Sequence, residues 1–206
     1  MERRFLYLVR HCRVEPDDGQ QRFNGHVDVP LSEKGMAQAH NLELMFRDVE
    51  LAAAFSSDLQ RARITAQTIV SPRGLAVTTR PDLREVNLGE WEGMTMADVR
   101  QRFPEAFRTR EANIAHYRIP GGESFADCSA RAVPALESIL AGTTGNLLVV
   151  AHGGVNRVLL CHLLGVPLEN MFRLRQDYAC INIIELGGFE VKLRLMNSAD
   201  LQKVDN

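Results

Sequence analysis

The sequence predicts an α/β fold, a three-layer α/β/α sandwich with a mostly parallel central sheet. Short uninterrupted apolar runs lie at residues 5–9 and 147–151, and such runs are typical of strands buried on both faces, as in parallel sheets covered by helices. Segments with apolar residues at helical spacing alternate with these runs, which favours the same architecture. No repeat or linker interrupts the 206 residues, so we expect one domain over residues 1–206.

The composition argues against several classes of function. The chain has 24 Lys and Arg against 26 Asp and Glu, so its net charge favours neither nucleic acid nor a membrane surface as a partner. Its four cysteines show no Cys-x-x-Cys spacing, unlike a zinc knuckle or a thioredoxin-like pair. It has no signal-peptide core and no apolar run of membrane-spanning length, so we expect a cytoplasmic protein with reduced thiols.

The N-terminal half is expected to contain three strands and two helices. Ser32 offers an N-cap side chain for the first helix, and residues 56–58 offer N-cap side chains for the second, whose apolar stripe begins at Leu59. In chain order, the predicted elements are a strand at residues 5–9, a polar loop at 15–28, a helix to about residue 48, a strand at 51–55, the second helix, and a weaker strand at 75–79.

The C-terminal half continues the alternation of strands and helices. Pro134 must kink the helical segment that contains it or start a second helix, and Gly187-Gly188 is expected to join the last two strands as a hairpin. The predicted elements are a glycine-punctuated loop at 83–93, a helix near 96–103, a segment with little periodicity at 104–123 that could be a lid, a helical segment from 124, a strand at 147–151, an apolar helix at 155–164, and strands at 180–186 and 189–195.

Polar residues suited to phosphate chemistry follow the two buried runs. Arg10 and His11 follow the first run, and His152 follows the second. Because ligands bind at the carboxyl ends of parallel strands, we expect the two histidines to converge on one site. Arg61 opens a helix that begins just past a strand, where backbone N–H groups favour an anion. Glu85 lies in the glycine-punctuated loop.

These residue types can divide the steps of phosphoryl transfer among them. An imidazole attacks phosphorus only when it is neutral, and nearby arginines would lower the pKa of His11. A leaving alkoxide needs a proton, which a carboxylic acid such as Glu85 could supply. Taken alone, each residue has a plainer interpretation: a structural histidine, a solvated Arg61, a Glu85 paired with Arg84. Their joint placement favours the functional interpretation.

Six ordered blocks of residues carry a family resemblance. They are Leu8-Val9-Arg10-His11, Pro30-Leu31-Ser32-Glu33-Lys34-Gly35, Ser56-Ser57-Asp58-Leu59-Gln60-Arg61-Ala62 with Thr65-Ala66, Leu83-Arg84-Glu85 with Leu88-Gly89-Glu90-Trp91-Glu92-Gly93, Pro120-Gly121-Gly122-Glu123-Ser124, and Val150-Ala151-His152-Gly153-Gly154. Together they resemble the histidine phosphatase superfamily, the phosphoglycerate-mutase-like proteins.

The resemblance implies a set of roles. His11 would become a phosphohistidine, Arg10, Arg61 and His152 would hold the phosphoryl group, and Glu85 would donate and accept the proton. The remaining residues that it implies are substrate-binding, and they are Asn24, Gly25 and Gly153. It implies a small-molecule phosphate ester as substrate, no metal and no cofactor, and it leaves a homodimer open.

Three functions stay open within this resemblance. Mutases usually follow the glutamate with an Arg-His-Tyr-Gly type sequence, whereas Glu85 is followed by residues 86–91 in the phosphatase style, so a phosphatase is favoured over a phosphomutase. A non-catalytic phospho-ligand-binding protein is the third alternative. Among phosphatases, the chain is similar to broad-specificity and α-ribazole phosphatases, which makes α-ribazole 5′-phosphate a candidate substrate.

The chain departs from the family pattern just after His11. The family usually has glycine next, then threonine and asparagine, whereas this chain has Cys12-Arg13-Val14 and an extra residue in the loop. Asp17 or Asp18 could stand where the asparagine is expected, with Arg13 to neutralise the charge. Cys12 itself could have a lowered thiol pKa and be oxidisable, or be buried and inert, and the second interpretation is favoured.

Overall fold

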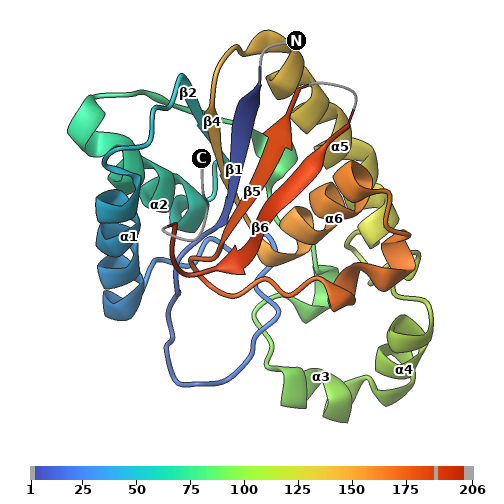
Figure 1. The fold of residues 1–206 in the computed structure, drawn as a ribbon. Coiled ribbons are helices and arrows are strands. Elements are labelled where there is room, and N and C mark those ends of the chain that lie inside the picture. Colours follow the sequence, from blue (N-terminus) through green and yellow to red (C-terminus); the bar gives the residue numbers. More distant parts are fainter. Residues whose placement is uncertain (1–2, 188–189, 202–206) are drawn as a thin grey trace.

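The computed structural model describes residues 3–187 and 190–201, which form a central sheet between two layers of helices (Figure 1). The strands are β1 Arg4–Arg10, β2 Ala53–Ser56, β3 Val77–Thr79, β4 Leu147–Ala151, β5 Ile181–Leu186 and β6 Lys192–Ser198. Their order in the sheet is β3-β2-β4-β1-β5-β6. The first four strands in that order are parallel, and β5 and β6 add an antiparallel edge. The predicted fold class is confirmed.

Helices cover both faces of the sheet, with α1 and α2 on one side and α5 and α6 on the other (Figure 1). The α-helices are α1 Glu33–Phe46, α2 Gln60–Val70, α3 Met96–Arg102, α4 Pro104–Ala112, α5 Phe125–Gly142 and α6 Gly153–Leu164, and the 3-10 turns are η1 Ser71–Arg73, η2 Pro81–Leu83, η3 Gly89–Trp91 and η4 Leu168–Arg173. Successive strand residues point to opposite faces, so Leu8 packs with the α5 and α6 cluster and Val9 with the α1 and α2 cluster. Every residue of β4 is buried, so packing on both faces fixes the position of its carboxyl end.

Two helix starts test the predicted caps. Ser32 caps α1 as predicted, because its hydroxyl accepts from the N–H of Gly35. The predicted cap of α2 at residues 56–58 is wrong, because the N-cap residue is Leu59 and no side chain caps it. Ser57 acts just outside the helix, where its hydroxyl accepts from the N–H of Leu59.

The segment from residue 104 is more ordered than the sequence pattern indicated. Residues 104–112 form α4, where Pro104 occupies the first turn, the position at which a fixed φ and a missing N–H are tolerated. The helix is short and mostly polar, with Phe107 its one buried residue, so it shows little apolar periodicity. Both α3 and α4 lie beyond the carboxyl ends of the parallel strands (Figure 1).

Several boundaries of the C-terminal half can be compared with the prediction. Pro134 lies inside a single helix, α5, so of the two predicted alternatives the start of a second helix is excluded. Helix α6 begins at Gly153 rather than residue 155. The last strand begins at Lys192, and its predicted start at residue 189 lies outside the described residues. The antiparallel pairing of β5 and β6 agrees with a hairpin, but Gly188 of the predicted Gly187-Gly188 turn lies outside the described residues.

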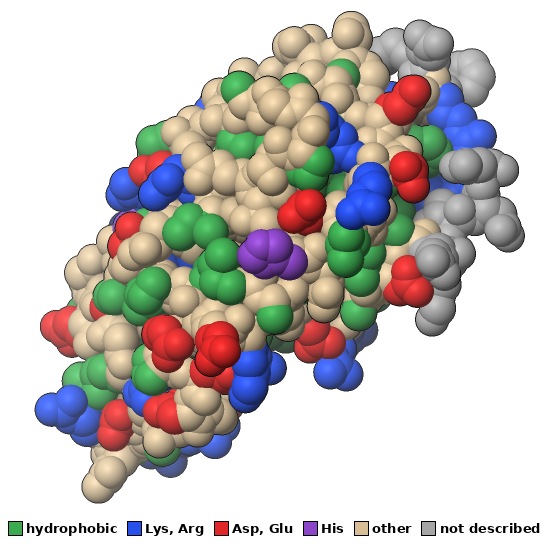
Figure 2. Space-filling model, turned by 90° about the vertical axis from the view of Figure 1, so that its left-hand side faces the viewer, with side chains coloured by type: hydrophobic (Ala, Val, Ile, Leu, Met, Phe, Trp, Pro, Cys, Tyr) green, Lys and Arg blue, Asp and Glu red, His purple; other side chains and the backbone are tan. Residues whose placement is uncertain are grey.

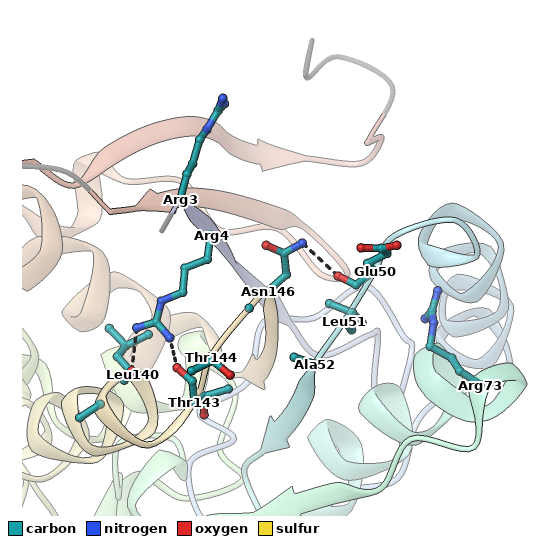
Figure 3. A pocket seen from close by; sticks show the side chains of 12 residues that line it. Arg3, Arg4, Glu50, Leu51, Ala52, Arg73, Leu140, Thr143, Thr144 and Asn146 are labelled. Carbon is teal, nitrogen blue, oxygen red and sulfur yellow. Dashed lines mark hydrogen bonds between the residues drawn. The ribbon is translucent and has the colours of Figure 1, made fainter. Parts of the chain in front are cut away.

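A hollow of about 810 Å³ lies at the edge of the sheet where the parallel strands begin, opposite their carboxyl ends (Figure 3). Two of its polar side chains are bonded to the chain: Arg4 donates to the carbonyl oxygens of Leu140 and Thr143, and Asn146 donates to that of Glu50. These bonds connect the starts of strands to the end of α5 and to the turn before β2.

The outer surface is mixed in character. On the face seen in Figure 2, hydrophobic side chains are interspersed with acidic and basic ones. Within residues 3–187 and 190–201, no helix is both long enough and apolar enough to cross a membrane.

Candidate active site

The two histidines lie side by side at the ends of β1 and β4. Arg10 and Ala151 are paired in register, and the N–H of His11 donates to the carbonyl oxygen of Ala151. The imidazole ring centroids of His11 and His152 are 5.0 Å apart, and the side chains are 5% and 0% exposed. The sheet thus brings together residues that are far apart in the sequence, as predicted from the carboxyl ends of parallel strands.

The environment of His11 favours a neutral ring with one free nitrogen. Its Nδ1 lies 2.7 Å from the carbonyl oxygen of Cys12, which can only accept, so Nδ1 carries the proton and Nε2 keeps its lone pair. Burial lowers the pKa of His11 well below 6.5, and the charges of Arg61 and Arg10 lower it further. Neutral imidazole is the form that can attack phosphorus.

This environment predicts the behaviour of His11 in acid. Because the pKa of His11 is lowered, the ring should stay neutral as the pH falls through 6.5 and gain a proton only below that value. Nitrogen-15 NMR of histidine-labelled protein should therefore show the neutral Nδ1–H form of His11 at about pH 5.5, where a free histidine is mostly charged. A titration midpoint at or above 6.5 would contradict this.

Arg61 sets the proton position on His152. The Nε of Arg61 donates to Nδ1 of His152 at 3.2 Å, so the proton of His152 sits on Nε2. That Nε2 is buried and has no hydrogen-bond partner among the described residues. The other donors of Arg61 reach the carbonyl oxygens of Val27, Gly25 and Asn24, so Arg61 also fixes the loop that carries Asn24.

Arg10 supplies a second unpaired donor to the same place. Its Nη1 donates to the carbonyl oxygen of Gln176, and its guanidinium carbon lies 3.9 Å from the ring centroid of Tyr178. Its Nε is buried without a partner among the described residues. A buried donor left unpaired is costly, so two such donors beside His11 indicate a site that an anion completes.

Glu85 is held by the start of α6. Its carboxylate accepts from the backbone N–H groups of Gly154, Val155 and Val86 at 2.9, 3.1 and 3.0 Å. A Cβ on Gly154 would lie 2.5 Å from the Glu85 Oε1, so this close approach requires glycine. Arg131 donates to the carbonyl oxygen of Glu85. The start of α6 therefore positions the carboxylate, a task that the sequence did not indicate.

Glu92 fastens the Asn24 loop to the Glu85 loop. Its carboxylate accepts from the N–H groups of Gly25, His26 and Val27, and also from that of Leu88. Sequence reasoning placed Glu92 in a motif without assigning it a task. Since Glu92 contacts both loops, it fixes the distance between them.

These residues surround one cavity, which we call the inner pocket. It measures about 210 Å³ and is lined by residues that include Arg10, His11, Asn24, Glu85 and Gly153. Arg61, His152 and Gly25 do not line it, but the His152 ring lies beside that of His11, and Arg61 donates to His152 and to the carbonyl oxygen of Gly25. A wider outer hollow of about 930 Å³ adjoins it and shares several of its residues. The structure thus brings together every site residue that the sequence predicted.

Tyr178 is a site residue that sequence reasoning missed. Its ring centroid lies 5.5 Å from that of His11, and it lines both cavities. Because β5 is antiparallel to β1, the chain that enters β5 arrives at the edge where β1 ends. The polar run at residues 175–178 just before that buried strand was the available signal.

Asp17 and Asp18, either of which could stand where the family has asparagine, are both paired. Asp17 pairs with Arg13 at 3.2 Å and with Lys34 at 3.1 Å, and Asp18 pairs with Arg22. Asp17 lines the outer hollow but not the inner pocket, and Asp18 lines neither. Their charges are therefore compensated away from the histidines.

Cys12 is fully buried beside the site, and burial raises its pKa to about 12. The thiolate, which is the oxidisable form, is therefore scarce at neutral pH, in agreement with the inert interpretation. We expect peroxide to inactivate the wild-type protein and Cys12→Ala at the same rate, measured as residual activity over time. Inactivation that thiol reverses in the wild type and that is absent in the variant would contradict this.

Comparison with known proteins agrees with the geometry. The profile of the histidine phosphatase superfamily (branch 1) matches residues 6–199. The chain belongs to this superfamily. It is 32% identical over 199 residues to the adenosylcobalamin/alpha-ribazole phosphatase of Escherichia coli, which covers 94% of this chain and 95% of that protein. The prediction of an enzyme of the histidine phosphatase type is confirmed.

Other relatives in the superfamily differ in the ester that their names specify. The chain is 33% identical over 178 residues to the glucosyl-3-phosphoglycerate phosphatase of Mycolicibacterium vanbaalenii, with 82% of this chain and 78% of that protein covered. The crystal structure of the alpha-ribazole phosphatase from Shigella flexneri superposes with a TM-score of 0.86 at 31% identity and covers 98% of this chain and 100% of that one. Relatedness therefore establishes the type of enzyme but not its substrate.

Proposed function

We propose that the protein hydrolyses phosphate monoesters through a phosphohistidine formed on Nε2 of His11. The observation that carries this proposal is that a neutral imidazole nitrogen, Nε2 of His11, lies near two buried donors that have no hydrogen-bond partner among the described residues. These donors are Nε of Arg10 and Nε2 of His152. Donors aimed at the place where charge develops stabilise a transition state strongly in a water-poor site.

In the first step, Nε2 of His11 attacks phosphorus and the ester P–O bond breaks. The bond electrons leave on the alcohol oxygen, which takes a proton from the carboxyl group of Glu85. Arg10 and His152 donate hydrogen bonds to the phosphoryl oxygens, and Arg61 holds His152 in the tautomer that can donate. The products of this step are the free alcohol and phosphohistidine.

In the second step, water attacks phosphorus of the phosphohistidine. The Glu85 carboxylate takes a proton from the water, the P–N bond breaks, and its electrons return to Nε2 of His11. The N–H groups of Gly154, Val155 and Val86 hold the carboxylate in place for both transfers. Inorganic phosphate leaves, and His11 is neutral again.

The named relatives suggest which esters to test first. α-Ribazole 5′-phosphate heads the screen because the Escherichia coli relative carries that name over almost its full length. Glucosyl-3-phosphoglycerate is the second, on the same ground.

A screen for released inorganic phosphate tests the proposal. Wild-type protein in the presence of a chelator is incubated with p-nitrophenyl phosphate, the two named esters and a panel of sugar phosphates and phosphoglycerates. We expect turnover without added metal and release of stoichiometric phosphate and alcohol. Transfer of phosphate to a second position of the substrate would instead identify a phosphomutase, and tight binding without turnover would identify a binding protein.

A further inference from the structure

The inner pocket carries more positive charge than the proposed reaction uses. Arg10, Arg22, Arg110 and Arg157 line it, whereas Glu85 is the one carboxylate among the described residues that do so. The reacting phosphoryl group lies at the His11 end, where Arg10 serves it. The other three arginines therefore need a separate explanation.

Two of these three arginines are bound by the chain itself. Arg22 forms an ion pair with Asp18 through Nη2, although its Nε has no hydrogen-bond partner among the described residues. The guanidinium of Arg157 donates to the carbonyl oxygens of Leu174 and Gly153. Both side chains therefore have structural partners in the protein.

Arg110 has no such partner among residues 3–187 and 190–201. It projects from α4 with its guanidinium carbon 5.8 Å from the ring centroid of Phe23 and 5.6 Å from that of Phe125. It makes no hydrogen bond or ion pair with any residue in the described part of the chain. The aromatic rings compensate part of its charge, but they leave its N–H donors free.

The surroundings of Arg110 withdraw its charge partly from water. The residue is half-buried, and none of its guanidinium nitrogens is among the fully buried unpaired atoms of the described residues. Burial lowers the pKa of Arg110, and the groups that oppose this are the carboxylate of Glu111 and the phenol of Tyr117, which act only over a distance. Even partial withdrawal of a charge from water without a partner costs free energy. Arg4, at the edge of the sheet where the parallel strands begin, differs from Arg110 because it donates hydrogen bonds to two carbonyl oxygens (Figure 3).

We propose that Arg110 binds a second anionic group, carried by the leaving group of the substrate. The preferred substrates are then phosphate monoesters whose alcohol part bears a carboxylate or a further phosphate. The inference rests on the proposed function, because it takes the phosphoryl group to lie at His11. A guanidinium binds such anions through paired N–H donors.

Matched pairs of esters test this selectivity. The carboxylate pairs are 3- and 4-carboxyphenyl phosphate, each compared with its uncharged carbamoyl counterpart, and the phosphate pair is fructose 1,6-bisphosphate against fructose 6-phosphate. The measured quantity is the ratio of kcat/KM within each pair. The variants are Arg110→Gln, which removes the charge, and Arg110→Lys, which keeps it. Arg108→Gln is the control, because Arg108 is an exposed arginine on the same helix.

We expect the wild-type protein to prefer the charged member of at least one pair by about ten- to a hundredfold, the range for one charge-assisted hydrogen-bonded contact. Arg110→Gln should bring that ratio close to one, Arg110→Lys should keep part of it, and Arg108→Gln should keep all of it. The pair that responds tells whether the anion is a carboxylate or a phosphate. The proposal is overturned if no pair shows a preference, or if Arg110→Gln slows both members equally.

Binding separates this inference from the proposed function. Calorimetry with His11→Ala and the same esters measures affinity without turnover, alone and combined with Arg110→Gln. If the wild-type protein hydrolyses no ester but the charged ester still binds more tightly in an Arg110-dependent manner, the proposed function fails and the inference stands. If hydrolysis occurs but affinity does not depend on Arg110, the inference fails alone.

Discussion

Replacing His11 with alanine is expected to lower kcat for every phosphate ester by about four orders of magnitude or more, as loss of an enzyme's covalent nucleophile does. Nδ1 of His11 donates a hydrogen bond to the carbonyl oxygen of Cys12, which leaves Nε2 as the ring nitrogen that should attack phosphorus. His152 cannot take over, because its Nδ1 accepts from Arg61 and its Nε2 therefore carries the proton. Steady-state rates of phosphate release measure the loss.

Trapping of the intermediate gives the same prediction a second measurement. Wild-type protein quenched in alkali during turnover of a phosphorus-32 ester should carry acid-labile label, and His11→Ala should carry none. His40→Ala is the matched control, because His40 is an exposed histidine on α1 that should keep both activity and label. Label on His11→Ala, or activity within about a hundredfold of wild type, would place the nucleophile elsewhere.

Glu85→Gln is expected to show the second largest loss, about 10²- to 10⁴-fold in kcat for esters of ordinary alcohols, which is the usual contribution of general acid–base catalysis. An amide can neither supply the proton to the leaving oxygen nor take one from water. It also replaces one carboxylate oxygen with an N–H donor that would face the N–H of Gly154 or of Val155. Steady-state kinetics with alkyl phosphates measure the effect.

The leaving group should decide which step suffers in Glu85→Gln. Nitrophenolate leaves without a proton, so phosphorylation of His11 by p-nitrophenyl phosphate should stay fast while hydrolysis of phosphohistidine slows. Stopped-flow absorbance should then show a burst of nitrophenolate that is absent in Glu90→Gln, a substitution of an exposed neighbour. Equal losses for alkyl and nitrophenyl esters without a burst would show that Glu85 does not transfer the proton.

The sequence was most informative where the sheet alone brings residues together. Residues 5–9 and 147–151 are apolar without interruption because both faces of β1 and β4 are covered, and that pattern predicts parallel neighbours with shared carboxyl ends. The convergence of His11 and His152 follows directly from it. Helix starts and the chemistry of phosphoryl transfer pointed to Arg61 and Glu85, and family resemblance added Asn24, Gly25 and Gly153.

Sequence reasoning was least informative where partners come from irregular segments. The hydrogen bonds from the N–H groups of α6 to Glu85 depend on the backbone conformation of the loop at residues 83–93. The spacing of apolar residues does not predict that conformation. The side-by-side position of β5 and β1 went unpredicted, and Tyr178 was missed with it. Helix α4 was not predicted, because a short polar helix that buries only Phe107 shows no apolar stripe in its sequence.

Glu92 has a consequence for how this scaffold can diversify. By accepting from the N–H groups of residues 25–27 and of Leu88, it connects the two loops beside the histidines through hydrogen bonds that α4 does not share. Helix α4 meets these loops through ring packing, with Phe107 stacked on Trp91 and Arg110 over Phe23. A substitution of Arg110 that keeps Phe107 in place can therefore change selectivity while the residues of the reaction are retained.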